Sequence, residues 1–487
     1  MIASVFQRIF APEFRQHLIA LTVASAMFME MLDGSVIATA LPQMAQTFHE
    51  NPINLGIGMS AYLLTLAVFI PSSGWMADRF GSKTIFLSAI AIFTIASVLC
   101  GFSNSLVAFT AARILQGIGG AMMVPVGRLV VLRGTEKQDL VNMMQFISTP
   151  ALIAPVLGPP IGGFITTFSS WRWIFFLNVP IGILGLALVA GFMVNYKAEQ
   201  HRTFDTPGFI LTGAGLASLL FGIDQLGRPS MDLPFTLGLL GGGAVVFAFA
   251  IRHLLRTPHP LVDLSLFRIP TFAISTLFAG TGFRIVIGSL PFLWPLLFQV
   301  GFGMTAFASG AVIVTCAVGD FSMKFFSKRV LRRFGFRKTL IVNGLLVALG
   351  VLGCAAFTAA TPIAVIAGLL FLIGLLRSVQ FGSFNALTYG DVPPEKMSSA
   401  SSLASTTQQM SFGLGVAFSA LVLHLASLSN GNRAQGFTVA DFHIAFAGAA
   451  AVAVASALAF TRLPANAGLD LSGHRGGAPR AARPALR

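Results

Sequence analysis

Charged residues are scarce in this chain: Asp, Glu, Lys and Arg together make up only 10% of its 487 residues. A soluble globular domain usually carries about 25% charged residues, so the composition argues against one. Hydrophobic residues make up 55% of the sequence, and the mean hydropathy is +0.81. These values are typical of a protein that crosses a membrane many times.

Cysteine is also rare, and no catalytic signature accompanies it. Cys100, Cys316 and Cys354 fall in apolar segments without metal-ligand spacing, so we expect neither a disulfide framework nor a metal site. The sequence contains no Walker loop, no dinucleotide fingerprint in a suitable context and no recognisable nucleophile constellation. We therefore expect no cofactor and no enzymatic activity, and an ATP-driven pump is disfavoured.

Long apolar runs are what the sequence does contain. A helix needs roughly 20 apolar residues to cross a bilayer, and about fourteen runs reach that length. The first run is too long for the core of a signal peptide and lacks a cleavage site, so we expect it to remain as an anchor. The runs cover 18–41, 54–76, 85–104, 107–131, 141–167, 173–194, 207–226, 234–254, 270–300, 306–326, 338–358, 362–386, 400–427 and 440–461.

Basic residues are distributed unevenly around these runs. With a cytoplasmic N-terminus and a reversal at each span, 25 of the 31 Lys and Arg residues fall in cytoplasmic segments and 3 in external loops. The cytoplasmic group includes three residues around Arg133 and seven in 324–338. This split follows the positive-inside rule. The net charge of +14 therefore indicates an inner (cytoplasmic) membrane protein with both termini in the cytoplasm, and not nucleic acid binding.

A short repeat indicates two related halves. The loop Asp78-Arg79-Phe80-Gly81-Ser82-Lys83 and the loop Arg332-Arg333-Phe334-Gly335-Phe336-Arg337 share Arg-Phe-Gly and are both basic. Parallel repeats occur in transporters whose substrate site lies between the halves near the midplane. We predict an all-α polytopic membrane protein with two six-helix bundles in a pseudo-twofold arrangement. Its parts are a lead-in (1–17), a first bundle (18–194), two inserted helices (195–269), a second bundle (270–461) and a disordered basic tail (462–487).

Glu30 and Asp33 lie within the first apolar run. A carboxylate at that depth costs about 2.5–3.5 kcal/mol on insertion scales, so we expect both to face a wet cavity or a cation. At 1.5 Å per residue, Arg113 in the fourth span lies at about the depth of Asp33, with Gln116 one turn away. We predict Asp33 as the proton carrier, Arg113 as its partner and Glu30 as a second titrating site. The alternative is a static ion pair that fixes helix register.

Acids and bases within the spans are balanced, three against three, which keeps the interior near neutral. Arg284, close to the middle of its span, is the second-half candidate for the cavity wall. Arg377 and Asp320 lie toward the cytoplasmic ends of their spans, and we expect them to extend to the interface. The balanced groups are Glu30, Asp33, Asp320, Arg113, Arg284 and Arg377.

Several segments resemble the motifs of one family, in the right order. Gly74–Lys83 resembles the loop signature G-x-L-A-D-R-x-G-x-K/R of the major facilitator superfamily. Leu32–Pro42, Arg113–Gly120, Gly158–Gly163 and Trp171–Pro180 resemble motifs of its fourteen-span drug–proton antiporters. The resemblance implies the major facilitator fold and export of amphipathic compounds in exchange for protons by alternating access.

The loop signature has a mechanical logic. Gly74 permits close helix approach, Gly81 allows a turn with positive φ, and Asp78 can accept charge-assisted hydrogen bonds that latch the cytoplasmic side. The alternative is a solvated topology signal.

In the fifth span, glycine permits tight packing and proline a bend, so this helix can pivot. The candidate residues are Gly74, Asp78, Arg79, Gly81, Lys83, Arg333, Gly335 and Arg337 in the gating loops and Gly158, Pro159, Gly162 and Gly163 in the fifth span.

The leading prediction is a proton-coupled exporter of amphipathic organic compounds, including drugs. One alternative is the same machine dedicated to a single physiological metabolite or siderophore. Another is a non-transporting sensor that reuses the fold, and an intramembrane enzyme is less favoured. The expected partners are a small-molecule substrate, protons and the lipid bilayer, with no nucleic acid. We expect a monomer, alone or with an accessory periplasmic adaptor.

Overall fold

The computed structural model describes residues 12–50, 52–137, 139–198, 203–226, 232–324, 326–429 and 437–472. Every regular element within these ranges is helical, and none is a strand. The long helices are α2 (Pro12–Phe48), α3 (Pro52–Phe69), α5 (Ser82–Phe102), α6 (Leu106–Gly134), α7 (Leu140–Phe168), α9 (Asn178–Phe192), α10 (Thr206–Leu226), α11 (Leu233–Arg256), α13 (Ala279–Leu296), α14 (Ala306–Met323), α16 (Phe336–Cys354), α17 (Ile363–Gly390), α18 (Met397–Ser429) and α19 (Val439–Ala459). The short helices are α4 (Ser73–Phe80), α8 (Trp173–Phe176), α12 (Pro270–Ala273), α15 (Ser327–Phe334) and α20 (Leu469–Ser472). The 3-10 and π turns are η1 (Ile70–Ser72), η2 (Leu264–Arg268), η3 (Ile274–Phe278), η4 (Leu297–Gly301), η5 (Pro394–Lys396) and η6 (Phe460–Arg462).

Twelve helices in these ranges are long and apolar enough to cross a membrane, or up to fourteen if each of two bent pairs is one span. The predicted apolar runs lie mainly on helices, although the runs 85–104, 173–194, 306–326 and 338–358 continue past the last helical residue. Most of these helices extend a few residues beyond the runs, because polar residues at the ends continue the same backbone hydrogen bonding. In the predicted lead-in 1–17, residues 12–17 belong to α2. Residues 1–11 lie outside the described part.

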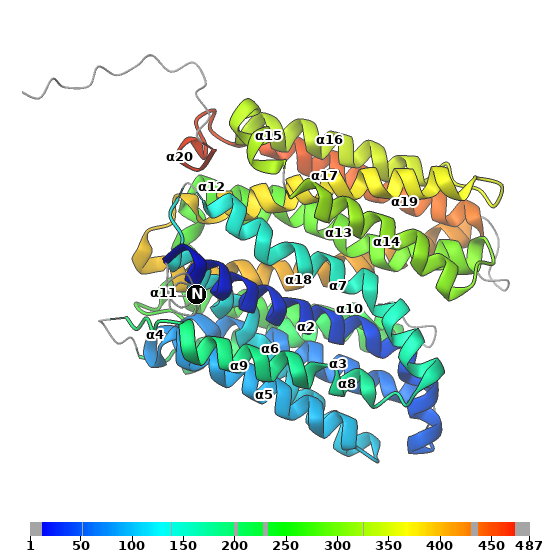
Figure 1. Cartoon of the computed structure of the whole chain (residues 1–487), viewed down its shortest axis with the longest axis horizontal. Helices are drawn as coiled ribbons and strands as arrows, with labels where there is room; N and C mark the ends of the chain where they lie inside the picture. Colours follow the sequence, from blue (N-terminus) through cyan, green and yellow to red (C-terminus); the bar gives the residue numbers. More distant parts are fainter. Residues whose placement is uncertain are drawn as a thin grey trace, which may run out of the picture.

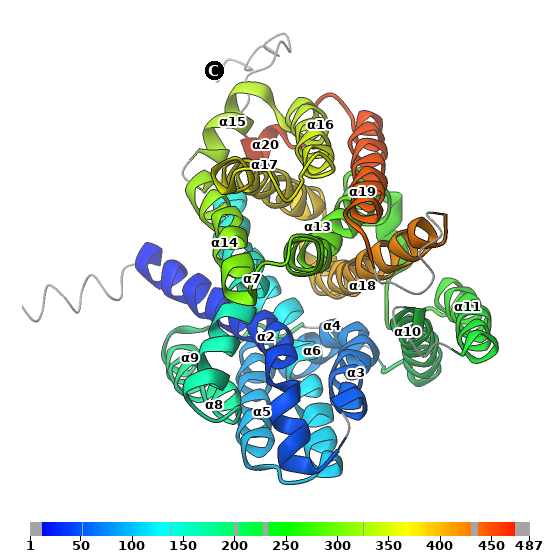
Figure 2. The same ribbon diagram turned by 90° about the vertical axis from the view of Figure 1, so that its right-hand side faces the viewer.

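The helices form two bundles with matching internal packing. Figures 1 and 2 show α3–α6, α8 and α9 on one side and α14–α17 and α19 on the other, with α7 and α18 between the two groups. In the first bundle, α2 packs against α7, α3 against α6 and α5 against α9. In the second, the corresponding pairs are α13 with α18, α14 with α17 and α16 with α19. A parallel repeat predicts this correspondence, and the predicted fold class is confirmed.

The two inserted helices, α10 and α11, pack on each other at the edge of the molecule (Figure 2). Asp205, just before α10, connects them: its carboxylate lies 2.8 Å from His253 Nε2 on α11 and accepts from the backbone N–H of Gly208 at 2.9 Å and of Leu261 at 3.1 Å. Burial raises the pKa of Asp205, but these hydrogen bonds outweigh burial and hold the pKa below the usual carboxyl value. The charged form of Asp205 is therefore the one that holds the helix pair together.

One end of the molecule, which we call the basic end, carries Arg79, Arg133 and the basic helix α15. The segment after α19 also packs at this end, which corrects the prediction of a wholly disordered tail (462–487). Leu463 and Leu471 are 1% and 3% exposed, and Leu471 lies against Gly390 at the end of α17. These two leucines bury apolar surface. The Arg- and Gly-rich composition of the whole tail gave no indication of this packing. Residues 473–487 lie outside the described part.

Two helices are irregular at positions that matter for the site. The segments Leu140–Pro155 and Pro160–Phe168 of α7 meet at a 50° bend, at the Gly-Pro-Pro sequence. Proline bends a helix because it lacks the N–H that would bond to the preceding turn. The π turn η3 interrupts the helix that starts at Pro270, and such a turn leaves backbone carbonyl groups free for other donors.

Candidate functional site

Asp33, Arg113 and Gln116 meet inside the first bundle. Arg113 Nη1 lies 2.5 Å from Asp33 Oδ2, and Gln116 Nε2 donates to Asp33 Oδ1 at 2.9 Å. Arg113 also donates to Gln116 Oε1 at 2.5 Å, and its guanidinium lies 4.2 Å from the ring centroid of Tyr62. The proximity that depth along the first and fourth spans predicted is therefore confirmed.

Two polar residues that the sequence analysis did not single out complete this group. Asn178 on α9 donates to Asp33 Oδ1 at 3.3 Å and to Ser97 Oγ on α5 at 3.2 Å. Gln116 Nε2 also donates to Ser97 Oγ, at 2.9 Å. A signal for Asn178 was present, because it is a polar residue inside the family-like segment Trp171–Pro180. We call Asp33, Arg113, Gln116, Asn178 and Ser97 the carboxylate cluster.

The carboxylate cluster is sealed in this conformation. The side chain of Asp33 is 0% exposed and that of Arg113 is 1% exposed. Of the two expected environments for this carboxylate, a wet cavity or a cation, the structure shows the cation. Removing one partner from a buried ion pair costs about 3–5 kcal/mol. A proton on Asp33 would remove the negative charge that Arg113 faces.

The bent helix α7 packs against α2 beside the carboxylate cluster. A Cβ atom at Gly158 would lie 2.7 Å from Ser35 Cβ, so glycine permits this close approach. Gly162 is buried, and Gly163 is half-buried with open space where a Cβ would stand. The side chain of Pro159 lies outside the described part. The bend and the tight contact place a point of possible pivoting next to the proposed proton site.

Arg128 was counted in the sequence analysis with the cytoplasmic residues around Arg133, and the structure corrects this. Arg128 lies within α6 and is 1% exposed. It crosses to the second bundle, where it donates to Tyr389 Oη at 3.2 Å, Gln408 Oε1 at 3.2 Å and Ser405 Oγ at 3.4 Å. It adds a fourth arginine to the three predicted within the spans. The position of Arg128 inside the apolar run 107–131 could have indicated that it lies within a span.

Glu30 lies between the carboxylate cluster and Arg128. The residue is 4% exposed, and its Oε2 atom is buried without a hydrogen-bond partner. Its carboxylate interacts with two charges, the repelling one of Asp33 and the attracting one of Arg128. Glu30 is therefore less firmly held than Asp33, both of whose carboxylate oxygens accept hydrogen bonds.

Arg284 is completely buried in the second bundle. Its Nη2 donates to Asn385 Oδ1 at 3.2 Å, and its Nη1 donates to the backbone carbonyl of Ser275 at 3.3 Å. The π turn η3 supplies that carbonyl, and the guanidinium lies 4.8 Å from the ring centroid of Phe384. In the described part, no carboxylate forms an ion pair with either Arg284 or Arg128.

Asp320 and Arg377 pair with each other and do not extend to the interface, contrary to the prediction. Arg377 Nε donates to Asp320 Oδ1 at 3.3 Å, and Nη2 donates to Oδ2. Their side chains are 0% and 2% exposed. The two helices carrying them approach closely at Gly374, where a Cβ would lie 3.1 Å from the backbone nitrogen of Asp320. This close packing buries both side chains, and Arg377 also borders the cavity described below.

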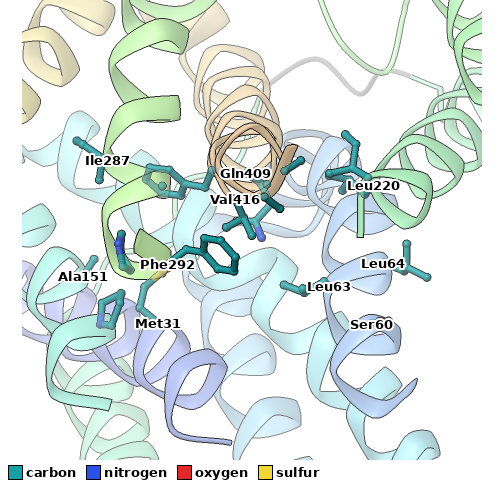
Figure 3. Close-up of a pocket in the computed structure, with 18 of the residues that line it drawn as sticks. Met31, Ser60, Leu63, Leu64, Ala151, Leu220, Ile287, Phe292, Gln409 and Val416 are labelled. Carbon is teal, nitrogen blue, oxygen red and sulfur yellow. The ribbon is translucent and has the colours of Figure 1, made fainter. Parts of the chain in front are cut away.

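A cavity of about 500 Å³ lies between the bundles. Figure 3 shows side chains of α2, α3, α7, α10, α13 and α18 around it. The walls are mainly apolar, with Leu63, Phe292 and Phe412 among the lining residues, and Arg377 also borders the space. The lining residues on α13 (287–292) and α18 (409–420) cover the middle of these helices and part of the half farther from the basic end.

The predicted cavity residues stand behind this lining. Glu30, Asp33, Arg113, Gln116 and Arg284 are not among the described residues that line the cavity. The prediction of Arg284 as part of the wall is therefore corrected: Ile287 and Gly288, about one turn farther along α13, line the space instead. Similarly, Met31 lines the cavity next to the buried Glu30.

The basic end is closed by contacts between the bundles. Asp78 accepts from Ser398 Oγ on α18 at 2.5 Å and from Arg133 Nη2 at 3.2 Å. A Cβ at Gly74 would lie 2.8 Å from the carbonyl oxygen of Ser398, so the two helices touch at their backbones. Deeper in the same contact, Ser402 Oγ donates to the carbonyl of Ile70 at 2.9 Å.

The other gating-loop residues occupy equivalent positions in the two halves and do not take part in the contact between the bundles described above. Gly81 and Gly335 occupy equivalent junctions and both have positive φ, 96° and 72°. Lys83 Nζ donates to the carbonyl of Ala190 at 2.7 Å, and Arg337 Nη2 donates to that of Thr461 at 2.8 Å. The side chains of Arg79, Arg332 and Arg333 are exposed.

Replacing Ser398 with Ala is expected to open the basic end more often. A hydrogen bond to a charged acceptor contributes about 1.5–3 kcal/mol, so its loss should raise the open population roughly tenfold. The measurement is the rate at which an impermeant maleimide, applied from the basic side, alkylates a cysteine introduced at the buried position Ala400. Ser399→Ala, one residue along α18, is the matched control. Equal rates for both variants would contradict a latch at Asp78.

The fold and site together define a membrane transporter: two helical bundles that close at one end and enclose a cavity beyond the closure. The chain belongs to the major facilitator superfamily, because the model of that family matches residues 23–416.

Two curated relatives support this membership. The protein named "Putative multidrug resistance protein MdtD" from Salmonella heidelberg (strain SL476) is 38% identical over 403 residues, which cover 82% of this chain and 85% of that protein. The protein of the same name from Salmonella typhimurium (strain LT2) has the same identity and coverage.

Solved structures show the same fold at low sequence identity. The human organic anion transporter MFSD10 (TETRAN) superimposes with a TM-score of 0.62 at 13% identity, covering 91% of this chain and 99% of that one. A double Trp mutant of XylE gives a TM-score of 0.63 at 15% identity, covering 94% and 98%. At such identities the two structures establish the fold alone.

Proposed function

We propose that this chain exports amphipathic organic compounds, including drugs, across the cytoplasmic membrane in exchange for protons. The observation that carries the proposal is the carboxylate cluster, a buried Asp33–Arg113 pair one layer behind a mainly apolar cavity. The curated relatives at 38% identity are named for multidrug resistance, which supports a drug-like cargo. The proposal includes a monomer that acts in the inner membrane.

The orientation follows from the positive-inside rule, which assigns the basic end to the cytoplasm. The contacts at Asp78 then close the cytoplasmic side, and the cavity lies toward the outside. In this proposal, the conformation with the Asp78–Ser398 contact closed is the one from which cargo leaves outward. The complementary state requires the Asp78–Ser398 contact to break and the bundles to rotate about the cavity.

Exchange requires that the two states bind protons differently, since otherwise no coupling arises. A proton arriving from outside neutralises Asp33 and frees Arg113, which loosens the contacts among α2, α6 and α9. Once these contacts loosen, α7 can move relative to α2 at its adjacent bend, near Gly158. Return to the cytoplasmic-facing state lets the proton leave and the Asp33–Arg113 pair reform. Glu30 is the second group that titrates in this scheme.

Asp33→Asn is expected to abolish substrate-driven proton movement in proteoliposomes while leaving downhill substrate equilibration. The amide has nearly the shape of the carboxylate but cannot bind and release a proton. The measurement combines an internal pH dye with uptake of a labelled substrate. Asp139→Asn is the control, because Asp139 forms an exposed ion pair with Lys328 at the basic end. Coupling of wild-type strength in the Asp33→Asn protein would remove Asp33 from the mechanism.

A further inference from the structure

Two arginines from opposite bundles meet on one turn of α17. Arg128 from α6 donates to Tyr389, and Arg284 from α13 donates to Asn385. Residues four apart on a helix have Cβ atoms about 5–6 Å apart, so both guanidinium groups converge on the same helical face. Their positive charges repel each other. Such an arrangement stores unfavourable energy unless a negative charge joins it.

The available negative charge is insufficient for both groups. The other two arginines buried in the spans, Arg113 and Arg377, each have an aspartate partner. Arg128 and Arg284 have between them the carboxylate of Glu30, which attracts Arg128 without a hydrogen bond at Oε2. A buried charge without a partner costs several kcal/mol. The trio of Glu30, Arg128 and Arg284 thus carries one positive charge in excess, or two when Glu30 is protonated.

The same location has unused hydrogen-bond donors. Arg284 Nε and Asn385 Nδ2 are buried, and neither has a hydrogen-bond partner. Both are N–H groups, which need an acceptor and not another donor. A buried donor left unpaired destabilises the protein. Excess positive charge and unused donors at one place fit an anionic oxygen group, such as a carboxylate, that the protein itself does not supply.

The cavity adjoins this trio. Ile287 and Gly288 line it about one turn beyond Arg284, Gln409 lines it next to the Arg128 acceptor Gln408, and Met31 lines it next to Glu30. The remaining wall is mainly apolar (Figure 3). An anionic group at the end of the cavity near the trio would therefore be continuous with an apolar body within it. Charges interact more strongly across a low-dielectric interior than across water.

We infer that the cargo of this transporter is an amphipathic organic anion, with its carboxylate bound by Arg284 and Arg128 and its apolar part in the cavity. This inference rests on the proposed export function and specifies its substrate class. Glu30 opposes the anion, because its own carboxylate shares Arg128. A proton on Glu30 strengthens binding of an anionic cargo, so for such a cargo exchange with protons runs through Asp33.

Equilibrium binding to the purified full-length protein in detergent tests the inference. The probes are a dansyl-labelled undecanoic acid, its methyl ester and the trimethylammonium analogue with the same chain. The wild type is expected to bind the carboxylate at least about tenfold more tightly than the ester, the fold-change that corresponds to about 1.4 kcal/mol. Arg284→Gln should remove this preference without weakening the ester, and Arg284→Lys should retain part of it.

The variant Glu30→Gln is expected to raise the affinity for the carboxylate probe, whereas Arg284→Gln lowers it. A folding defect would not raise the affinity. This variant should bind the carboxylate more tightly than the wild type and leave ester binding unchanged. Arg252→Gln, an exposed position on α11, is the matched control and should change neither probe. Equal wild-type affinity for carboxylate and ester, tighter binding of the ammonium probe, or an unchanged preference in folded Arg284→Gln would overturn the inference. No proton gradient is involved, so the result is independent of the coupling test on Asp33.

Discussion

Arg377→Gln is expected to lower the free energy of unfolding by about 3–5 kcal/mol, because it leaves Asp320 buried without its cation. The side chain of Asp320 is 0% exposed, and both of its oxygens accept from Arg377. The Asp320 carboxylate would then remain buried between α14 and α17 without a charged partner. The measurement is thermal unfolding of the purified protein in detergent, followed by the fraction that remains monodisperse.

Two further variants test whether the loss of stability comes from the buried ion pair or from the removal of any charged side chain. The double variant Asp320→Asn/Arg377→Gln should recover most of the loss, because two neutral amides can bond to each other without a buried charge. Lys328→Gln breaks the exposed pair with Asp139, 3.0 Å long, and should cost about 1 kcal/mol at most. If Arg377→Gln is no worse than Lys328→Gln, the buried pair contributes little to stability.

Gly374→Val is expected to destabilise the second bundle by about 1–3 kcal/mol or more, since there is no room for a side chain at this position. A Cβ at Gly374 would collide with the backbone carbonyl of Cys316 and lie 3.1 Å from the backbone nitrogen of Asp320. Gly319 makes the reciprocal close contact with the backbone of α17 near Phe371. Small residues that let helix backbones touch are a main source of helix association in membranes.

The same helix provides the control for this prediction. Gly368 also lies on α17, but a Cβ there would meet no atom within 4 Å. Gly368→Val should therefore leave the melting temperature nearly unchanged when both variants are measured side by side. A similar loss for the two variants would show that intrinsic helix propensity, and not the contact between α14 and α17, governs position 374.

The sequence was sufficient for the fold because the bilayer forces every span to be a long apolar helix. It was also sufficient for the Asp33–Arg113 pair, since depth along two straight helices can be counted from their ends. Counting failed for Arg128, which lies near a helix end and yet inside the contact between bundles. Position within a span gives depth but says nothing about which neighbouring helix covers a side chain.

The same limit explains the errors on Arg377, Asp320 and Arg284. Each was assigned by its place along one helix, whereas its environment depends on a second helix far away in the sequence. The closeness of α14 to α17 buries the first two, and the π turn η3 offers Arg284 acceptors that hydropathy does not reveal. The C-terminal segment was misjudged for a related reason, because two leucines outweigh a polar composition once a partner helix is present.

The inserted pair α10 and α11 has a consequence for how cargo reaches the transporter. Leu220, Phe221 and Ile223 of α10 form one flank of the cavity, and α10 touches both α3 and α18. Without this helix, the chamber would gain a side window onto the acyl chains of the membrane. We therefore expect the insertion to separate the cavity from lipid tails on this side of the molecule.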